Sequence, residues 1–304
     1  MAFKRRINRP KIDIDNICKE FDKNENTVNE TISKELDLWG MKANEIMETL
    51  FTLALKDREF NPNGDCCKAG EPEKEIKKLA VTTFPSTDTI KAAAEWGADM
   101  LLVHEPLYYD HLDAYSTKKL QTEKRELIEK SGMTIYRFHD HAHFCPEDLI
   151  AIGMVKQLGF DADVKYITPG QNVRITLNQP MTAVEIAKHI EKTLGLRHVR
   201  ICGQRNLPAT VITGMFGAPD GVLDLLQAED TQVILVGETC EWMMAEYARD
   251  AGLMGHNKTL LILGHAGSEE AGMVYISDLI AEMMPELQVK YIPCGEVYTY
   301  TDDE

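Results

Sequence analysis

The stretch ADMLLVHEP (residues 98–106) has a short apolar centre, MLLV, that is followed at once by His-Glu-Pro. A continuous apolar run of this length is typical of a β-strand that is buried on both faces of a parallel sheet. The residues before it, STDTIKAAAEWG (86–97), predict a helix, and KKLAVTTF (77–84) predicts an earlier strand. Strand, helix and strand in this order predict a right-handed β-α-β unit.

The same alternation returns later in the chain. TQVILVGE (231–238) predicts a strand, CEWMMAEYARDAG (240–252) a helix, and KTLLILGHAGSEE (258–270) a strand that ends in a histidine. GMTIYRF (132–138) predicts one more strand. We therefore expect an α/β fold with mostly parallel sheets flanked by helices, in which ligands gather at the carboxyl ends of the strands. The other expected elements are a strand at 174–177, a helix at 182–195, a strand at 198–203, and a strand, turn and helix over 210–227.

The 304 residues suffice for two domains of ordinary size. Residues 1–40 are expected to form a polar N-terminal arm and the start of a first amphipathic helix, which runs from about 32 to 56 with an interruption near Gly40. We expect a first α/β lobe at 41–165 and a second at 166–304, with the C-terminal part of the second packing back on the first.

Charge and cysteine content narrow the class of protein. The net charge of −16 disfavours a broad surface for nucleic acid or anionic membranes. The seven cysteines include no CxxC pair, and the basic start is followed by no apolar run. We expect reduced thiols in a cytoplasmic protein.

Three of the predicted strands are followed by clusters of histidine and acidic residues. The clusters contain His104 and Glu105, then His139, Asp140, His141 and His143, then His265 and Glu269. A lone histidine at a strand end is usually a hydrogen-bonded structural residue, but three such ends in one α/β chain, two of them with a nearby glutamate, favour a metal site. Imidazole combined with carboxylate suits zinc, manganese, iron, cobalt or nickel rather than calcium.

Taken in order, GADMLLVHEPLYY, IYRFHDHAHF and LLILGHAGSEEAG resemble the motifs of the Nif-three-like family, also described as GTP cyclohydrolase I type 2 homologues. Members of that family are similar in a strand ending His-His-Pro, a strand leading to His-Thr-x-x-Asp, and a late Gly-His-x-x-x-Glu. The resemblance runs from about Met41 to Tyr300 and fits the form without an inserted domain. It implies a Nif-three-like fold, a dinuclear metal centre and a ring-shaped homohexamer.

The resemblance also implies five metal ligands. They fall on His104, Glu105, His143, His265 and Glu269. Glu105 stands where the second histidine is expected, and His143 stands where the aspartate is expected. The exchange leaves three imidazoles and two carboxylates, so we expect a retained but rearranged site for two divalent metals. One metal, or a different one, would also fit.

Residues near these ligands are assigned supporting roles. His139 matches the first histidine of its family motif and would orient a ligand or touch the substrate. Asp140 and His141 would be additional ligands, partners that fix an imidazole tautomer, or simply solvated residues. Ser268 is expected to be a helix N-cap, which would place Glu269 in the first helical turn.

The Gly-rich turn GMFGAPDG (214–221) lies between a predicted strand and a predicted helix. The backbone N–H groups of Gly214 and Gly217 could bind phosphate there. The turn lacks the lysine of a P-loop, and a lone glycine turn is most often only a turn. Glu238 ends the neighbouring strand and would point toward the histidines.

Two functions from different classes fit these residues. The first is a dinuclear-metal-dependent hydrolase in which Glu105, Glu238 or His139 moves the proton of an activated water. The resemblance implies GTP as the substrate, in a cyclohydrolase reaction, and another nucleotide or a phosphoester is the second choice. The alternative is a non-catalytic regulatory or metal-handling protein, whose metal site would be closed by protein ligands.

Overall fold

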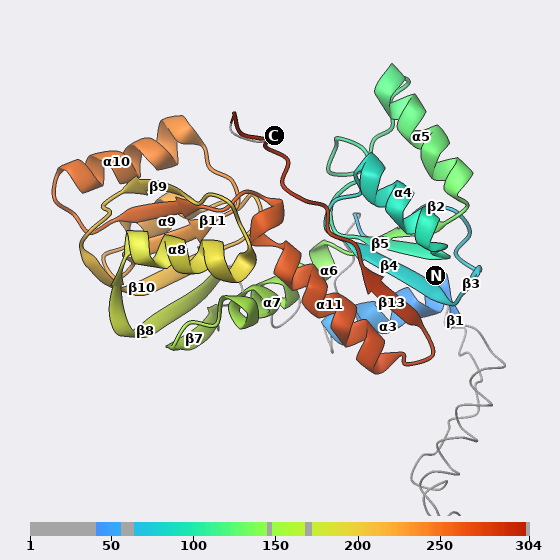
Figure 1. Cartoon of the computed structure of the whole chain (residues 1–304), viewed down its shortest axis with the longest axis horizontal. Coiled ribbons are helices and arrows are strands. Elements are labelled where there is room, and N and C mark those ends of the chain that lie inside the picture. Colours follow the sequence, from blue (N-terminus) through green and yellow to red (C-terminus); the bar gives the residue numbers. More distant parts are fainter. Residues whose placement is uncertain (1–40, 56–63, 145–147, 168–171, 302–304) are drawn as a thin grey trace, which may run out of the picture. The chain divides into compact units, whose positions relative to one another are not determined.

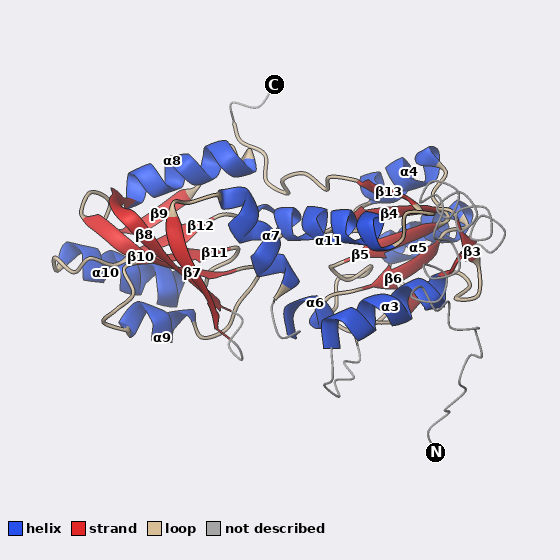
Figure 2. Cartoon of the chain, turned by 90° about the horizontal axis from the view of Figure 1, so that it is seen from below, coloured by secondary structure: helices blue, strands red, loops and turns tan. Residues whose placement is uncertain are grey.

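The computed structural model describes residues 41–55, 64–144, 148–167 and 172–301. The expected arm at 1–40 lies outside these residues. The described strands form a five-stranded sheet, a six-stranded sheet and a two-stranded ribbon, with helices packed around the two larger sheets (Figure 2). The predicted α/β fold is therefore confirmed.

The five-stranded sheet has the strand order β13-β4-β5-β6-β2. Its strands are β13 (Gln288–Tyr291), β4 (Lys78–Thr82), β5 (Met100–Val103), β6 (Thr134–Arg137) and β2 (Cys67–Ala69). The first four run parallel to one another, and β2 pairs antiparallel with β6. β13 comes from the C-terminal end of the chain, so that end completes the sheet built by the N-terminal half.

Helices cover both faces of this sheet. They are α4 (Thr87–Trp96) and α5 (Lys119–Ser131) on one face, and α3 (Ala43–Leu55) and α11 (Glu270–Met283) on the other (Figure 1). Side chains of β5 alternate between the two layers, because successive residues of a strand point to opposite faces. Met100 and Leu102 pack with α3 and α11, whereas Leu101 and Val103 pack with α4 and α5. This two-sided burial explains why the MLLV run contains no polar position.

The six-stranded sheet has the strand order β7-β8-β10-β11-β12-β9. Its strands are β7 (Ala162–Ile167), β8 (Asn172–Thr182), β10 (Pro208–Met215), β11 (Val233–Val236), β12 (Thr259–Ile262) and β9 (Arg200–Gly203). On one face lies α8 (Ala183–Leu194), and on the other lie α9 (Val222–Gln227) and α10 (Glu246–Leu253). α10 is continuous with a π-helix at Glu241–Ala245.

The second sheet is mixed and contains fewer parallel pairs than the expectation of mostly parallel sheets. Only β10-β11 and β11-β12 are parallel among its described pairs, whereas β7-β8, β8-β10 and β12-β9 are antiparallel. Four residues separate β7 from β8, and a parallel pair needs a crossover of a dozen or more residues. The two parallel pairs lie at the centre of the sheet, where the predicted strand-helix-strand unit stands.

Two helices connect the sheets close to the histidine clusters. α6 (Asp140–Phe144) follows β6, and α7 (Leu149–Leu158) packs against α11. Gly153 of α7 and Gly272 of α11 have no room for a Cβ atom, because each faces backbone of the other helix. Glu269, directly before α11, lies with Oε1 3.7 Å from Nε2 of His143 in α6.

The remaining described elements are small. β1 (Met41–Lys42) pairs antiparallel with β3 (Glu75–Ile76), and a 3-10 helix spans Ala266–Ser268. β7 begins at Ala162, ahead of the expected boundary between residues 165 and 166, and the division into lobes at these residues stays a prediction. In the part of the chain that the structure describes, no helix is both long and apolar enough to cross a membrane.

Candidate metal centre

The carboxyl ends of three strands carry the histidine clusters. His104 and Glu105 directly follow β5, His139 stands between β6 and α6, and His265 follows β12 after two residues. Parallel strands bring such positions to one edge of a sheet. β5 and β6 are neighbours in the first sheet, whereas β12 belongs to the second sheet, so the cluster joins the ends of both.

His104 and His143 face each other through their Nε2 atoms, which lie 3.1 Å apart. His104 Nδ1 lies 3.1 Å from the carbonyl oxygen of Phe138, and His143 Nδ1 lies 3.1 Å from Asp148 Oδ2. Both acceptors lack a proton, so each Nδ1–H donates outward, and in the neutral form of either ring the lone pair of Nε2 faces inward. Two lone pairs at this distance repel each other unless a proton or a cation lies between them.

His265 and His139 repeat the same arrangement. His265 Nδ1 lies 2.7 Å from Glu238 Oε1, and His139 Nδ1 lies 2.6 Å from Asp140 Oδ1. In each ring the Nε2 atom is turned toward Glu105, at 3.1 Å from Glu105 Oε1 for His265 and 3.7 Å for His139. A carboxylate or carbonyl on the outer nitrogen is the usual way in which proteins orient a metal-binding histidine.

Glu269 lies at the centre of the cluster and is 1 % exposed. Its Oε2 atom is 3.3 Å from His265 Nε2 and 3.6 Å from His104 Nε2, and its Oε1 atom is 3.7 Å from His143 Nε2. Among the residues that the structure describes, Oε2 is buried without a hydrogen-bond partner. A buried carboxylate oxygen left without a donor is costly, and a cation would satisfy it.

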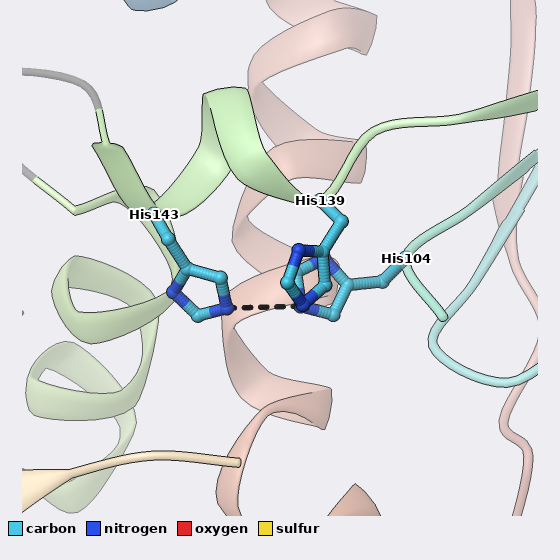
Figure 3. A group of neighbouring side chains, drawn as sticks. All are labelled: His104, His139 and His143. Atoms are coloured by element: carbon cyan, nitrogen blue, oxygen red, sulfur yellow. Dashed lines mark hydrogen bonds between the residues drawn. The ribbon is translucent and has the colours of Figure 1, made fainter. Parts of the chain in front are cut away.

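These donors form two compact groups that could each hold a metal ion. One consists of His104, His139 and His143, which Figure 3 shows with their rings turned toward one another. The other consists of His104, Glu105 and Glu269. Within each group the donor atoms lie within 4.8 Å of one another. Nitrogen donors with carboxylate oxygens fit a divalent transition metal, so the residues present suit the expected cofactor.

The pKa shifts within the cluster also favour a bound cation. Burial would lower the pKa of His265, but the neighbouring carboxylates of Glu105 and Glu269 prevail and raise it to about 11. Burial also opposes the charged form of His143, yet Asp148 and Glu269 raise its pKa well above the usual value. Without metal, these rings therefore hold protons that neutralise the carboxylates, and a bound cation would replace those protons.

His139 behaves differently from these two rings. Burial, and then the neighbouring charge of His104, lower its pKa to about 4 against the opposing effect of Asp140. The ring is therefore neutral at pH 7, with its Nε2 lone pair available.

His141 points away from the cluster. Its ring packs on Phe51, with centroids 4.2 Å apart, and its Nδ1 atom lies 2.9 Å from Asp65 Oδ2. Asp65 also accepts the backbone N–H groups of His139 and His141 at 2.8 Å each. His141 thus anchors the start of α6, and sequence reasoning missed Asp65 because a turn residue 76 positions away carries no signal of that contact.

Arg137 is a second residue that the sequence analysis did not select. It is fully buried, its Nε–H donates to the carbonyl oxygen of His104 at 3.1 Å, and Nη1 donates to the carbonyl oxygen of His111. The guanidinium therefore holds the backbone at the carboxyl end of β5. A single arginine in a predicted strand gives no sign of this role.

The predicted helix cap at Ser268 is wrong by one position. α11 begins at Glu270, and Glu269 occupies the cap position without a side-chain cap hydrogen bond. Ser268 ends the preceding 3-10 helix, where its hydroxyl donates to the carbonyl oxygen of His265 at 2.8 Å. A tight turn after His265 replaces the expected first helical turn, and it leaves the Glu269 carboxylate free to face the histidines.

The Gly-rich turn lies directly against this 3-10 helix. Gly214 is part of β10 and pairs within the sheet, while the N–H of Gly217 donates to Ser268 Oγ at 2.8 Å. Gly217 has φ +72°, and a Cβ there would meet the Glu269 carboxylate. The N–H group that phosphate binding would need is thus already used, and the glycine provides space for Glu269.

Comparison with known proteins places the chain among relatives. The family model described as Duf34/NIF3 (NGG1p interacting factor 3) matches residues 41–296. The chain belongs to the Duf34/NIF3 family. This confirms the Nif-three-like resemblance, and the matched span begins where the described part of the chain begins.

The relatives of this Duf34/NIF3 protein differ from it at most positions of the aligned sequence. A protein of Clostridium perfringens named GTP cyclohydrolase 1 type 2 homolog is 24 % identical over 261 residues, which cover 84 % of this chain and 97 % of that protein. A protein of the same name from Methanocaldococcus jannaschii is 31 % identical over 110 residues, or 36 % of this chain and 44 % of that one.

Solved structures show the same fold. The hypothetical protein SA1388 of Staphylococcus aureus aligns with a TM-score of 0.67 and 16 % identity over 86 % of this chain and 100 % of that chain. A protein called ybgI, of unknown function, aligns with a TM-score of 0.68 and 20 % identity over 84 % of this chain and 99 % of that chain. At such identities the likeness establishes the Duf34/NIF3 fold of this chain and nothing about its reaction.

Proposed function

We propose that this Duf34/NIF3 protein is a metal-dependent hydrolase that acts on a nucleotide or a related small molecule. One observation supports the proposal most directly. Four histidines donate Nδ1–H outward and turn Nε2 toward two buried carboxylates, and one carboxylate oxygen has no partner. We expect two divalent ions per chain, drawn from zinc, manganese, iron, cobalt and nickel.

Five side chains would hold the metals: His104, Glu105, His143, His265 and Glu269. When bound, divalent cations would lower the pKa of a water molecule and polarise the bond to be cleaved. Asp148 and the carbonyl oxygen of Phe138 would keep the imidazole tautomers that leave Nε2 free for the metal.

Two carboxylates of this chain would take part in proton transfer. Glu105 Oε1 lies within hydrogen-bond distance of His265 Nε2, and Glu238 Oε1 binds the opposite nitrogen of the same ring. The side chain of Glu238 is 57 % exposed, so a proton that reaches it can leave to solvent. Glu105, near the reacting atoms, or Glu238 would accept the proton, and the His265 ring would not relay it between them, because its Nε2 lone pair would hold a metal.

A groove beside His265 supports a small-molecule substrate. The groove measures about 400 Å³, and its lining includes Arg197, Tyr298 and Tyr300. A smaller recess that shares both tyrosines extends to His265 itself. The aromatic rings suit a nucleobase and the guanidinium a phosphate, while Glu270 and Glu296 add negative charge to the lining; the volume falls within the range of ligand pockets. GTP, named in the description of the Clostridium perfringens relative, is the first nucleotide to test.

Metal analysis followed by a hydrolysis screen tests the proposal. Full-length protein loaded with zinc, manganese or cobalt is incubated with GTP, other nucleotides and phosphoesters. We expect turnover that His265→Ala removes and that His256→Ala, which changes an exposed histidine outside the centre, retains. Loaded wild-type protein without turnover on any of these compounds would refute the hydrolase.

The alternative is a non-catalytic metal-binding protein, and the burial of the centre favours it. His104 is fully buried and Glu269 is 1 % exposed, so the protein encloses much of the donor set. A structural site would be closed by protein ligands, whereas a catalytic site keeps one position for water. If inorganic phosphate leaves the visible spectrum of the cobalt-loaded protein unchanged, the metal-handling function is favoured.

Assembly and cellular location stay predictions. We propose the ring-shaped homohexamer implied by the resemblance. Large exposed apolar side chains support an interface between copies of the chain. Trp242, Leu253 and Met254 are 78 %, 80 % and 76 % exposed on the π-helix and the end of α10. Light scattering of the full chain would give the oligomeric state. A cytoplasmic location is expected from the sequence alone.

A further inference from the structure

His139 lies within the cluster of donors and not at its margin. Its ring centroid is 4.6 Å from that of His104 and 5.0 Å from that of His143. The three rings come from two neighbouring strand ends, with His104 after β5 and the other two around α6 (Figure 3). A residue that only touched substrate would not need to pack against two other imidazoles.

The tautomer of His139 is set for a metal. Asp140 Oδ1 lies 2.6 Å from Nδ1 of the ring, and a carboxylate oxygen can only accept there. Nε2 therefore carries the lone pair, and it lies 3.7 Å from Glu105 Oε1 on the inner side. Asp65 binds the backbone N–H of His139 at 2.8 Å, so the main chain at this residue is also held.

Counting lone pairs divides the donors into two sets. His104 has one Nε2 lone pair, so it can bind one metal, and it shares a compact nitrogen group with His139 and His143. His265 Nε2 instead lies 3.1 Å from Glu105 and 3.3 Å from Glu269. Glu269 also reaches toward His104 and His143 with both oxygens, so it lies between the two sets.

We propose that the centre has two unequal metal positions, a nitrogen-rich one formed by His104, His139 and His143 and a carboxylate-rich one formed by Glu105, His265 and Glu269. His139 is then a metal ligand and not a proton carrier. The inference rests on the metal site of the proposed function and is independent of hydrolysis.

The two positions differ in the metals that they prefer. Three imidazoles bind zinc, cobalt or nickel tightly, whereas two carboxylates with one imidazole suit manganese better and bind zinc less tightly. Zinc should therefore fill the centre in two separate steps, with the nitrogen-rich position first. A symmetric pair of positions would fill in one step.

Calorimetric titration of metal-free full-length protein with zinc alone tests the assignment. We expect two steps for the wild type, and His139→Ala should lose the tight step and keep the weaker one. Asp140→Asn, which keeps the ring but loses its anchoring carboxylate, should weaken the tight step by about tenfold to hundredfold. His256→Ala is the matched control and should titrate as the wild type does.

X-ray absorption on protein with one zinc per chain provides the second readout. The wild type should show three imidazoles on zinc, and His139→Ala, in which zinc occupies the carboxylate-rich position, should show one. The inference is overturned if His139→Ala, folded by circular dichroism, keeps both steps at wild-type affinity or keeps its imidazole count. Wild-type protein that binds no zinc overturns it as well. Zinc binding in two steps without any hydrolysis would refute the hydrolase and leave this assignment standing.

Discussion

Each histidine of the centre depends on a partner that holds its outer nitrogen. For His143 the partner is Asp148, and for His265 it is Glu238. The partner decides which nitrogen carries the proton, and this decides whether the inner nitrogen can bind a metal. Substitutions at such partners should therefore alter metal affinity even though they remove no ligand.

Gly217 allows a test of how closely the Gly-rich turn fits Glu269. Gly217→Ala should weaken metal binding about tenfold or more, because the new Cβ would meet the Glu269 carboxylate. Gly221→Ala is the matched control, since Gly221 has φ +78° and nothing within 4 Å of an added Cβ. Both variants lose about 1 kcal/mol of stability from the left-handed backbone. Equal zinc affinities in the two variants, measured by calorimetry, would contradict the close fit.

Lys124 allows a test of buried charge away from the centre. It is 5 % exposed, its ammonium lies over the Tyr109 ring, and burial lowers its pKa to about 8 despite the nearby charge of Asp113. A lysine with a lowered folded-state pKa binds protons less well than the unfolded chain, so its contribution to stability rises as the pH goes from about 8 to 10.5.

Lys124→Met should therefore stabilise the protein by about 2–3 kcal/mol at pH 7, and the gain should shrink as the pH approaches 10.5. Urea unfolding at several pH values measures the difference in free energy of unfolding between Lys124→Met and the wild type. The other titrating groups contribute equally to both proteins, so they cancel in this difference. A difference that stays constant with pH would show that the lysine is not desolvated in the native state.

At the scale of elements, one residue serves both α7 and the metal centre. Asp148 Oδ1 accepts the N–H of Ala151 as the N-cap of α7, while its Oδ2 accepts Nδ1–H of His143. The end of one helix is thereby coupled to the imidazole of the preceding one. The two contacts can be separated by substitution.

Asp148→Ser should keep the helix cap and lose the contact with His143. We expect stability within about 0.5 kcal/mol of the wild type and zinc affinity weaker by about tenfold or more. Asp148→Ala should lose both contacts, with an additional stability loss of about 1 kcal/mol. Denaturant unfolding and zinc calorimetry on both variants separate the two effects, and a serine variant with wild-type zinc affinity would rule out the positioning role.

Elements also show where sequence patterns succeed and where they fail. The MLLV run predicted a buried central strand correctly, because burial on both faces excludes polar residues from the strand itself. The strand β7 was not predicted, and β9 was predicted without its antiparallel orientation, since strand direction depends on which edge a strand joins. The cap at Ser268 failed because contacts with Gly217 favour a 3-10 turn there.

At the scale of the whole molecule, the candidate centre joins two sheets. His104 and Glu105 follow a strand of the five-stranded sheet, and His265 and Glu269 follow a strand of the six-stranded sheet. Metal that binds only this assembled arrangement should stabilise the native state of the whole described region.

Metal removal should therefore lower the free energy of unfolding. Zinc at one hundred times its dissociation constant should stabilise the protein by about 2.7 kcal/mol relative to chelator-treated protein. His265→Ala should respond much less, and His256→Ala should respond as the wild type does. Thermal or denaturant unfolding with and without zinc measures the effect, and identical curves for the wild type would mean that the metal does not bind this arrangement.

The sequence by itself determined the α/β class, the central strands, the family and the three strand ends at which donors gather. These properties depend on short-range patterns: apolar runs, strand-helix alternation, and histidines placed directly after strands. Only the tertiary structure settled which nitrogen of each ring faces inward and that His139 lies among the donors. It also showed that Asp65 anchors the start of α6 and that Asp148 anchors His143. Those facts depend on contacts between distant residues, such as His265 with Glu105 across 160 positions of sequence. No local pattern encodes such a contact, because it exists only after two separate sheets have packed together.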